Sequence, residues 1–465
     1  MRSKSRSMVI RCSINYIAGI AGADNKRLLT RLVSRTAIAL SCAGLSVNAH
    51  AADSHHQNNF EGTSFQDIVQ WDAWYTVEAA SNISGGQDRG SAYAGQIVLD
   101  SDIDLEKAFN WKNTNLNVLF TSRHGSSATS SHIGSSTSIQ EVYGGNDTRL
   151  SLFSIEKTFF DGQLEVEGGR MAGGNNFFQN SICQYFQNNA ACGNPTFIFR
   201  SSQFSYWPVA AWGARVKYHF SPKIYAHIGA YEDNRQFEGA EDHGFDWSTD
   251  ESKGVVLPFM VGYQTTWETA RYPATYEVGG WYDTSTYNDP LNDEAGNPAG
   301  ISGNDYAQLN GRSGWYASFE KVVTRPDPDK PVGLKLFGDV YTKGTGTVAD
   351  DYYIKLGFLQ QGTWAGRDED AVGLMVIRQQ YTDRALENQR LARARNGGTG
   401  TPASSMTMIE LTYSYHVNDV LRITPNLHYI INPDQFNEPG RTENLNDAFA
   451  LGLRFDVDLK GLLYR

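Results

Sequence analysis

The sequence lacks any long apolar run. None of its uncharged apolar stretches approaches the roughly 20 residues that a membrane-spanning helix requires. That absence excludes a helical membrane protein, but not a β-barrel, in which lipid-facing and lumen-facing residues alternate. A basic excess is also missing, because the 465 residues include 40 Lys and Arg against 51 Asp and Glu. A broad nucleic-acid-binding surface is therefore not expected.

Residues 1–51 have the pattern of an export signal with an extended N-terminal region. Four basic side chains within residues 26–35 precede an apolar stretch over 36–47, and Ala49-His50-Ala51 supplies the small residues of a cleavage site. The apolar stretch is too short to span a membrane. The mature chain is therefore predicted to begin with a short polar leader over 52–69.

Cysteine is scarce. Two of the four cysteines, Cys12 and Cys42, lie in the predicted signal, which leaves Cys183 and Cys192. Two cysteines in an exported chain predict one disulfide, with two free thiols as the alternative. No second Cys pair or nearby His pair completes a zinc site, so neither a metal nor another cofactor is expected.

The signal also removes positive charge. Eight of the 40 basic and one of the 51 acidic residues lie within 1–51, so the mature chain carries 32 basic and 50 acidic residues, a net charge of −18.

Sixteen segments alternate between apolar and polar residues. From Phe449 to Leu459 every odd position is apolar, and the even positions include Arg454, Asp456 and Asp458. A period of two predicts strands with one apolar and one polar face.

The links between these segments alternate in length. The short links lie near 107–114, 161–162, 221–223, 268–271, 325–330, 365–370 and 418–419. The long links lie at 83–91, 125–146, 172–208, 233–254, 285–312, 344–350, 384–405 and 433–446. Seven short and eight long links predict an all-β fold, a sixteen-stranded antiparallel transmembrane β-barrel over 70–465. The barrel would have short periplasmic turns and long extracellular loops.

A soluble all-β protein, such as a lectin-like sandwich or a secreted glycosidase, would show the same alternation. Sixteen strands in sandwiches would need two or three cores joined by linkers, and no linker is visible. A hydrolase motif of the Gly-x-Ser-x-Gly type is also missing. The chain is therefore not expected to be an enzyme, and no catalytic residue is assigned.

Several segments carry a more specific pattern. They are 75–86, 99–111, 169–218, 278–283, 424–433 and 450–454, and the stretch from Cys183 to Trp212-Gly213-Ala214-Arg215 is the most specific. Together they resemble the OprB-type carbohydrate-selective porins of Gram-negative outer membranes, over most of residues 70–460. Two features depart from that resemblance. Arg465 follows Tyr464 where such barrels usually end in an aromatic residue, and the links 285–312 and 384–405 match nothing in the family.

The resemblance implies an exported outer-membrane protein that passes glucose-like sugars passively. Its implied partners are small neutral carbohydrates, outer-membrane lipid, lipopolysaccharide and the barrel-assembly machinery. A monomer and a homotrimer both remain open.

A pore that prefers sugars needs paired donors and acceptors to replace lost water, and a flat aromatic face. Binding must also stay weak enough for the solute to leave. Strand alternation places the following charged residues in the lumen: Arg123, Glu165, Glu167, Arg215, Lys217, Glu277, Lys335 and Lys355. Each is a candidate sugar contact, with an ordinary hydrated lumen charge as the alternative.

Trp281 and Arg170 are two further candidates. Trp281 shares a face with Glu277 and Asp283, and it is either a solute-stacking or a structural aromatic. Arg170 faces outward on strict alternation, but Gly168-Gly169 permits a bulge that would re-aim it inward. The resemblance favours the inward orientation.

The link 172–208 is predicted to narrow the pore. It is long and rich in aromatic residues, and the loop at the same place in general porins folds into the barrel. A disulfide within it would stiffen the constriction by limiting its alternatives. The alternative is an external loop that needs a staple.

The sequence therefore favours a porin for passive, selective diffusion of monosaccharides such as glucose and related small carbohydrates. A general porin, or one for another small solute such as a carboxylate, is the alternative on the same barrel. A mixed sign among the predicted lumen charges favours a neutral solute.

Overall fold

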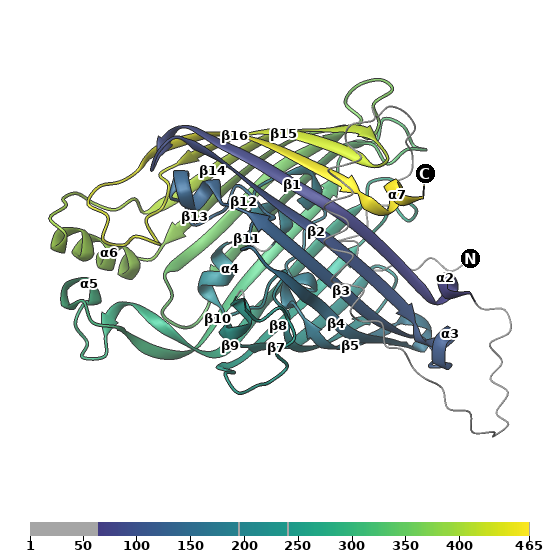
Figure 1. The fold of residues 1–465 in the computed structure, drawn as a ribbon, viewed down its shortest axis with the longest axis horizontal. Coiled ribbons are helices and arrows are strands. Elements are labelled where there is room, and N and C mark those ends of the chain that lie inside the picture. Colours follow the sequence, from purple (N-terminus) through teal and green to yellow (C-terminus); the bar gives the residue numbers. More distant parts are fainter. Residues whose placement is uncertain (1–63, 194–195, 240, 465) are drawn as a thin grey trace.

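The computed structural model describes residues 64–464, apart from 194–195 and 240. The predicted export signal 1–51, and residues 52–63 of the predicted leader, lie outside the described residues. The described chain forms one closed antiparallel sheet of sixteen strands, in which the first strand pairs with the last (Figure 1). This confirms the predicted barrel.

Sixteen strands follow one another around the barrel in chain order. They are β1 (Val69–Gly86), β2 (Gly90–Asp104), β3 (Thr114–Gly125), β4 (Thr148–Phe159), β5 (Leu164–Met171), β6 (Ala211–His219), β7 (Ile224–Asp233), β8 (Gly254–Gln264), β9 (Ala274–Asp293), β10 (Tyr306–Val322), β11 (Gly333–Lys343), β12 (Asp350–Gln361), β13 (Ala371–Tyr381), β14 (Ser405–Asn418), β15 (Leu421–Ile431) and β16 (Asn446–Asp458).

Helices occur only in the connections and at the ends of the described chain. They are α2 (Phe65–Ile68), α3 (Leu105–Phe109), α4 (Thr196–Ser201), α5 (Ala299–Ser302), α6 (Asp383–Arg395) and α7 (Leu459–Leu463). Short 3₁₀ turns include η5 (Cys183–Tyr185), η6 (Asn189–Cys192) and η7 (Arg235–Glu238), and η2 (Thr129–Ile133) is a π-helical turn. Among the described residues, no helix is both long and apolar enough to span a bilayer.

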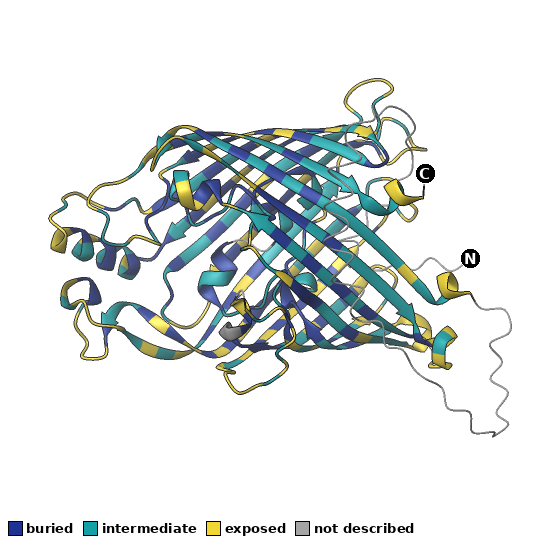
Figure 2. Ribbon diagram, viewed as in Figure 1, coloured by how far each residue is buried: buried dark blue, intermediate teal, exposed yellow. Residues whose placement is uncertain are grey.

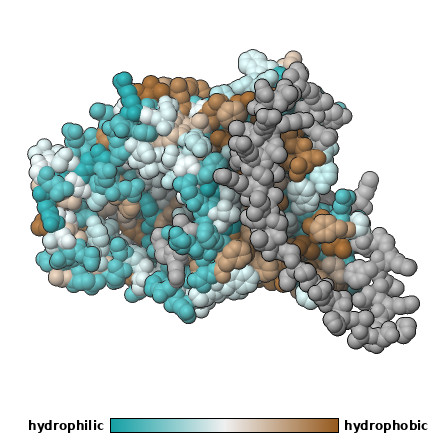
Figure 3. Space-filling view, in the orientation of Figure 1, coloured by the Kyte–Doolittle hydropathy of each residue, from teal (hydrophilic) through white to brown (hydrophobic). Residues whose placement is uncertain are grey.

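Alternation along each strand separates the two faces of the wall, as the banding in Figure 2 shows. In β15, Leu427 and Tyr429 point outward and are exposed, whereas Asn426 and His428 are buried inside. The outward set is apolar because lipid offers no hydrogen bonds to polar groups. Apolar surface gathers over the barrel wall toward the turn end, and hydrophilic surface covers the loop end (Figure 3).

Two of the predicted long links are shorter than expected. β9 and β10 continue to Asp293 and from Tyr306, so only 294–305 remain as a loop where 285–312 was predicted. β1 and β2 likewise leave only 87–89. These predictions were wrong because a strand pair that extends beyond the membrane no longer needs an apolar outer face. The exposed residues Thr284, Thr286 and Asn288 are polar, and the buried inner face carries Ser285 and Asp289 as well as Tyr287. The pair keeps its backbone ladder, as in Leu309↔Tyr287, without an apolar-polar alternation.

Two loops fold into the barrel and supply most of its core. The β5–β6 loop over 172–210 buries seven Phe and Ile side chains, which are Phe177, Phe178, Ile182, Phe186, Phe197, Ile198 and Phe204. The β3–β4 loop over 126–147 buries Ile133 and Ile139. The apolar core of this protein therefore lies inside the lumen, between the inward loops and the wall.

Candidate functional site

An aromatic layer fastens the β5–β6 loop to the wall. Phe178 lies edge-on to Trp281 of β9 and to Tyr316 of β10, with ring centroids 5.7 and 4.8 Å apart. Phe197 approaches the same Trp281 at 6.3 Å. Edge-to-face pairs contribute roughly 0.5–1.5 kcal/mol each beyond the area they bury.

Trp281 is covered by this layer. It points into the barrel, as its strand position predicts, but only 1% of it is exposed. A ring sealed on its faces has no surface left for a solute. The geometry therefore fits the structural interpretation of Trp281, which is to support the inward loop.

Glu410 of β14 anchors the tip of the loop. Its carboxylate accepts hydrogen bonds from the backbone N–H of Gln187 (2.7 Å) and of Asn188 (3.1 Å), and from the Asn188 side-chain amide (2.5 Å). Its side chain is completely buried, and His428 is the nearest ionisable partner, 3.8 Å away. Hydrogen bonds to an ionised acceptor are the strong ones, so this carboxylate fixes the tip in place.

Two predicted lumen lysines also serve as anchors. Lys355 is fully buried and joins Asp339 (2.7 Å) and the Ala190 carbonyl (2.9 Å). Lys335 donates to the Ser181 hydroxyl (2.7 Å) and pairs with a carboxylate of β10 (3.0 Å). Both lysines face the lumen as predicted, and both hold the β5–β6 loop against β11 and β12.

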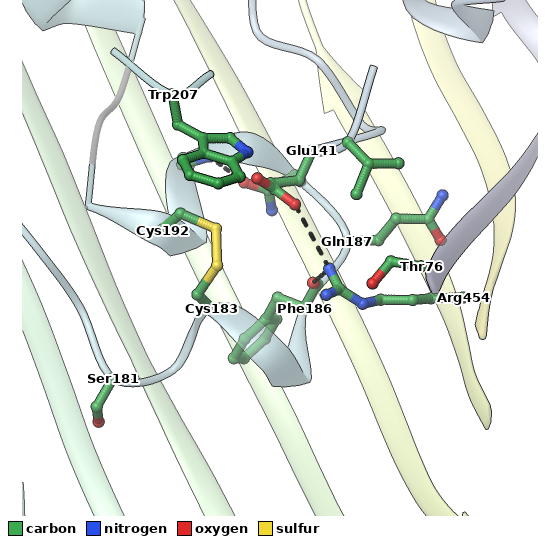
Figure 4. Close-up of a disulfide and its surroundings, with 12 residues drawn as sticks. Thr76, Glu141, Ser181, Cys183, Phe186, Gln187, Cys192, Trp207 and Arg454 are labelled. Carbon is green, nitrogen blue, oxygen red and sulfur yellow. Dashed lines mark hydrogen bonds and ion pairs between the residues drawn. A yellow bond between two sulfur atoms is a disulfide. The ribbon is translucent and has the colours of Figure 1, made fainter. Parts of the chain in front are cut away.

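The tip of the loop is closed by a disulfide between Cys183 and Cys192, nine residues apart, which confirms the predicted bridge (Figure 4). Its sulfur atoms lie within 4.8 Å of a carboxylate oxygen of Glu141 from the β3–β4 loop. The Glu141 backbone N–H donates to the Gln187 carbonyl at 2.8 Å, so the two inward loops are joined.

Arg215 of β6 lies among three carboxylates. Its Nε donates to Glu167 (2.5 Å), Nη2 to Glu156 (2.8 Å) and Nη1 to Glu165 (3.4 Å). His219 also reaches Glu165, at 3.0 Å. Adjacent strands bring these groups together, since Glu165 and Glu167 of β5 stand directly beside Lys217 and Arg215 of β6.

Arg454 of β16 is the centre of a second such cluster. Its guanidinium contacts Asp456 (2.9 Å), Glu78 (3.0 Å) and Glu141 (3.8 Å). It also donates to the Phe186 carbonyl at 3.3 Å. Figure 4 shows Arg454, Glu141 and Phe186 beside the disulfide.

A polar link lies between the two clusters around the barrel. Arg123 of β3 donates to the Gln96 side-chain oxygen at 2.6 Å, and the Trp207 indole N–H donates to the same oxygen at 2.8 Å. Trp207 is only half-buried. Trp207 therefore keeps accessible surface, in contrast to Trp281.

The other two predicted lumen residues, Lys217 and Glu277, both contact Tyr225 of β7. The Tyr225 hydroxyl donates to Glu277 at 2.6 Å, and the Lys217 ammonium lies 4.4 Å from the centre of the Tyr225 ring. Both groups face inward as strand alternation predicts.

Arg170 lies on the opposite face from the one expected. β5 pairs with β4 and β6 without a register shift, so Gly168-Gly169 forms no bulge. Arg170 stands beside the outward Trp212, while the neighbouring Met171 belongs to the inner core. Its guanidinium lies 4.0 Å from the centre of the Phe237 ring, in the β7–β8 loop. The inward orientation was wrong because continuous pairing preserves the alternation.

Several functional candidates were missed from the sequence, among them Arg454 at an inward position of β16 and Trp207 of the inward loop. Glu78, Glu156 and Asp456 occupy inward positions that the same alternation marks, but they were not singled out. Glu141 lies in a long loop, and no local signal indicates that this loop returns into the barrel.

Comparison with known proteins gives consistent matches. A family model described as carbohydrate-selective porin, OprB family, matches residues 88–459. Porin B of Pseudomonas aeruginosa is 32% identical over 459 residues, which cover 93% of this chain and 99% of that protein. Putative porin QuiX of Acinetobacter baylyi is 26% identical over 401 residues, or 81% of this chain and 86% of that protein. The high-pH structure of Pseudomonas putida OprB is 28% identical and superposes with a TM-score of 0.77 over 84% of this chain and 94% of that one.

Proposed function

This chain belongs to the OprB family of carbohydrate-selective porins, and we propose that its lumen passes monosaccharides such as glucose and related small carbohydrates by passive diffusion. The family membership confirms the resemblance found in the sequence. It also makes the protein a sugar-selective porin of the Gram-negative outer membrane.

The solute route that we propose runs between the inward loops and the wall formed by β16 and β1–β6. On the other wall, the carboxylates of Glu410 and Asp339 are sealed against the loop with no exposed side-chain surface. On the proposed side, Glu156, Glu165 and Asp456 still meet water. We propose that the loop at 172–208 constricts the lumen, and the space that its buried side chains fill supports this.

The proposal rests mainly on one observation: Arg215 and Arg454 each contact three carboxylates. A sugar that leaves water must find both donors and acceptors for its hydroxyl groups. These clusters offer carboxylate acceptors beside guanidinium donors. Because the groups already satisfy one another, a sugar replaces only some of these bonds and binds weakly. Weak binding permits release and hence flux.

Trp207 supplies the aromatic face in this proposal. Its indole is held by Gln96, which also orients Arg123, so a flat ring stands beside a guanidinium. Stacking of the apolar face of a sugar on such a ring would add roughly 0.5–1.5 kcal/mol. This role replaces the one expected for Trp281.

Planar-bilayer recordings test the function. We expect glucose to enter and reduce the ion current, with weaker effects from the larger maltose and sucrose. In Trp207→Leu, block by glucose should weaken about twofold to tenfold. Trp111→Leu, at an exposed turn position, is the matched control.

The outcomes separate two statements. If glucose neither permeates nor affects the current of the wild-type protein, the proposed function is wrong. If glucose blocks Trp207→Leu as it blocks the wild-type protein, only the aromatic role is wrong. Lipopolysaccharide contacts, assembly partners and a monomeric or homotrimeric state remain predictions from family membership.

A carboxylate porin is the competing function. It would need an excess of inward cations at the constriction, and each of the two arginine clusters instead holds more carboxylates than cations. The same recordings decide this point when glucose is replaced by acetate.

A further inference from the structure

The charges that meet water in the two arginine clusters described above are mainly negative. In the two arginine clusters, the side chains of Glu141, Glu156, Glu165 and Asp456 are 16%, 17%, 18% and 24% exposed. The central guanidiniums are only 5% (Arg215) and 7% (Arg454) exposed. A solute in the lumen therefore encounters carboxylate oxygens before it encounters the cations behind them.

This arrangement follows from the hydrogen bonds of each arginine. All three nitrogens of Arg215 are directed at carboxylates, so a solute reaches its donors only by replacing one of these bonds. Arg454 likewise donates hydrogen bonds to Glu78, Asp456 and the Phe186 carbonyl. One cation cannot neutralise three anions, so each cluster keeps an excess of negative charge.

Nearby cations reduce this excess without reversing it. Arg123 is buried and directed at Gln96, and Lys217 stands beside Glu165 with its ammonium over the Tyr225 ring. Arg422 stands beside Asp456 and donates to Gln184. His219 faces Glu165. The other lumenal ion pairs are one-to-one, as in Lys355–Asp339, Lys335–Glu320, Arg312–Asp283 and Arg200–Asp350. They add no net charge to the route.

We propose that this channel also passes amino sugars that carry a protonated amine, and that it admits them better than sugar acids of the same size. The inference rests on the proposed sugar channel and names a second substrate class for the same route. An ammonium group replaces one hydroxyl and can donate to the exposed carboxylates, whereas a sugar carboxylate meets like charge. Walls of one sign raise the local concentration of the opposite ion.

The size of the effect is set by Coulomb energy in a hydrated passage. A unit charge 4 Å from another in water changes local occupancy about fivefold, and physiological salt reduces that factor. Each carboxylate on the route should therefore contribute about twofold to fivefold to the preference for a cation over an anion.

Two measurements on the purified full-length barrel test the proposal. Proteoliposomes are assayed at neutral pH for uptake of D-glucosamine, D-glucose and D-glucuronate. The reversal potential in a KCl gradient gives the permeability ratio of K⁺ to Cl⁻. We expect glucosamine to enter at least as fast as glucose, glucuronate to enter severalfold more slowly, and the ion ratio to exceed one.

The second part of the test removes lumenal carboxylate charge by substitution. Glu156→Gln/Glu165→Gln should lower the K⁺ to Cl⁻ ratio and the glucosamine to glucuronate ratio, each about fourfold or more. Glu141→Gln, in a loop rather than in the wall, tests the same idea if the double variant fails to fold. Glu387→Gln/Glu438→Gln removes two carboxylates outside the barrel and is the matched control.

The outcomes are distinct from those for the proposed function. A wild-type ion ratio at or below one, equal entry of glucosamine and glucuronate, or ratios that the lumenal variants leave unchanged would each overturn the inference while glucose still enters. Failure of glucose to enter would instead overturn the sugar channel itself.

Discussion

Replacement of Glu410 should loosen the constriction without unfolding the barrel. Glu410 is the one described carboxylate that accepts three hydrogen bonds from the tip of the β5–β6 loop, through Gln187 and Asn188. Glu410→Gln keeps the shape of the side chain but removes its charge and one acceptor. The new amide then faces N–H groups that are themselves donors.

The magnitude follows from those bonds. A hydrogen bond to a charged group contributes roughly 1.5–3 kcal/mol, and a buried donor left unsatisfied costs roughly 1–3 kcal/mol. Loss of one of the three bonds and weakening of the others should therefore destabilise the closed tip by about 2–5 kcal/mol. Relief from burying a carboxylate without a close cation offsets part of this cost.

Single-channel recording is the assay. We expect Glu410→Gln to show a larger or more frequently fluctuating conductance and weaker block by glucose. Its heat-modifiable migration in electrophoresis should stay that of a folded barrel, because sixteen ladders do not depend on the loop. Glu387→Gln on the external helix α6 is the control. Conductance and glucose block equal to those of the wild-type protein would refute the anchoring role.

Three further predictions follow from other contacts. Arg215→Ala leaves three carboxylates without their shared cation, so glucose block should weaken by up to about tenfold in bilayer recordings, and equal block would show that Arg215 takes no part in binding. Cys183→Ser/Cys192→Ser should raise current fluctuations while the barrel stays folded, since it frees the tip of the inward loop, and a quiet channel would contradict this. Hydrogen bonds to the Asp147 carboxylate and to the Thr148 carbonyl raise the pKa of His243. The contact between His243 and Asp147 therefore stabilises the β7–β8 loop at pH values below about 6.5, and this stabilisation is lost as pH rises through the elevated pKa. Limited proteolysis of that loop should therefore be faster at pH 8.5 than at pH 5.5, relative to a His243→Asn control, and an equal pH response of the two proteins would contradict the latch.

The sequence by itself determined the architecture. Lipid on one side and water on the other impose a period of two on each strand, so the number of strands, their order and the sides of turns and loops are all visible without coordinates. The same alternation placed the side chains of Glu167, Arg215 and Lys217 on the inner face. The disulfide followed from the count of cysteines left after the predicted export signal.

Apolar-polar alternation no longer identifies a strand where the strand extends beyond the lipid. The strand pair β9–β10 extends beyond the lipid, where its exposed face is polar, so 285–312 was interpreted as a loop although much of it is paired. Arg170 shows the converse error, because a permitted glycine bulge was preferred to the alternation, and the continuous ladder kept the outward position.

Only the tertiary structure decided what fills the lumen. A strand position shows that Trp281, Lys335 and Lys355 point inward, but not whether they meet solute or a returning loop. That depends on contacts between residues as distant as Asn188 and Glu410, for which no local pattern exists. The inward path of the loop is set by the sum of its aromatic packing and its buried anchors. Consequently the sequence predicted the strands of the barrel wall and the direction of their side chains, but not which lumenal surface the loop leaves open to a sugar.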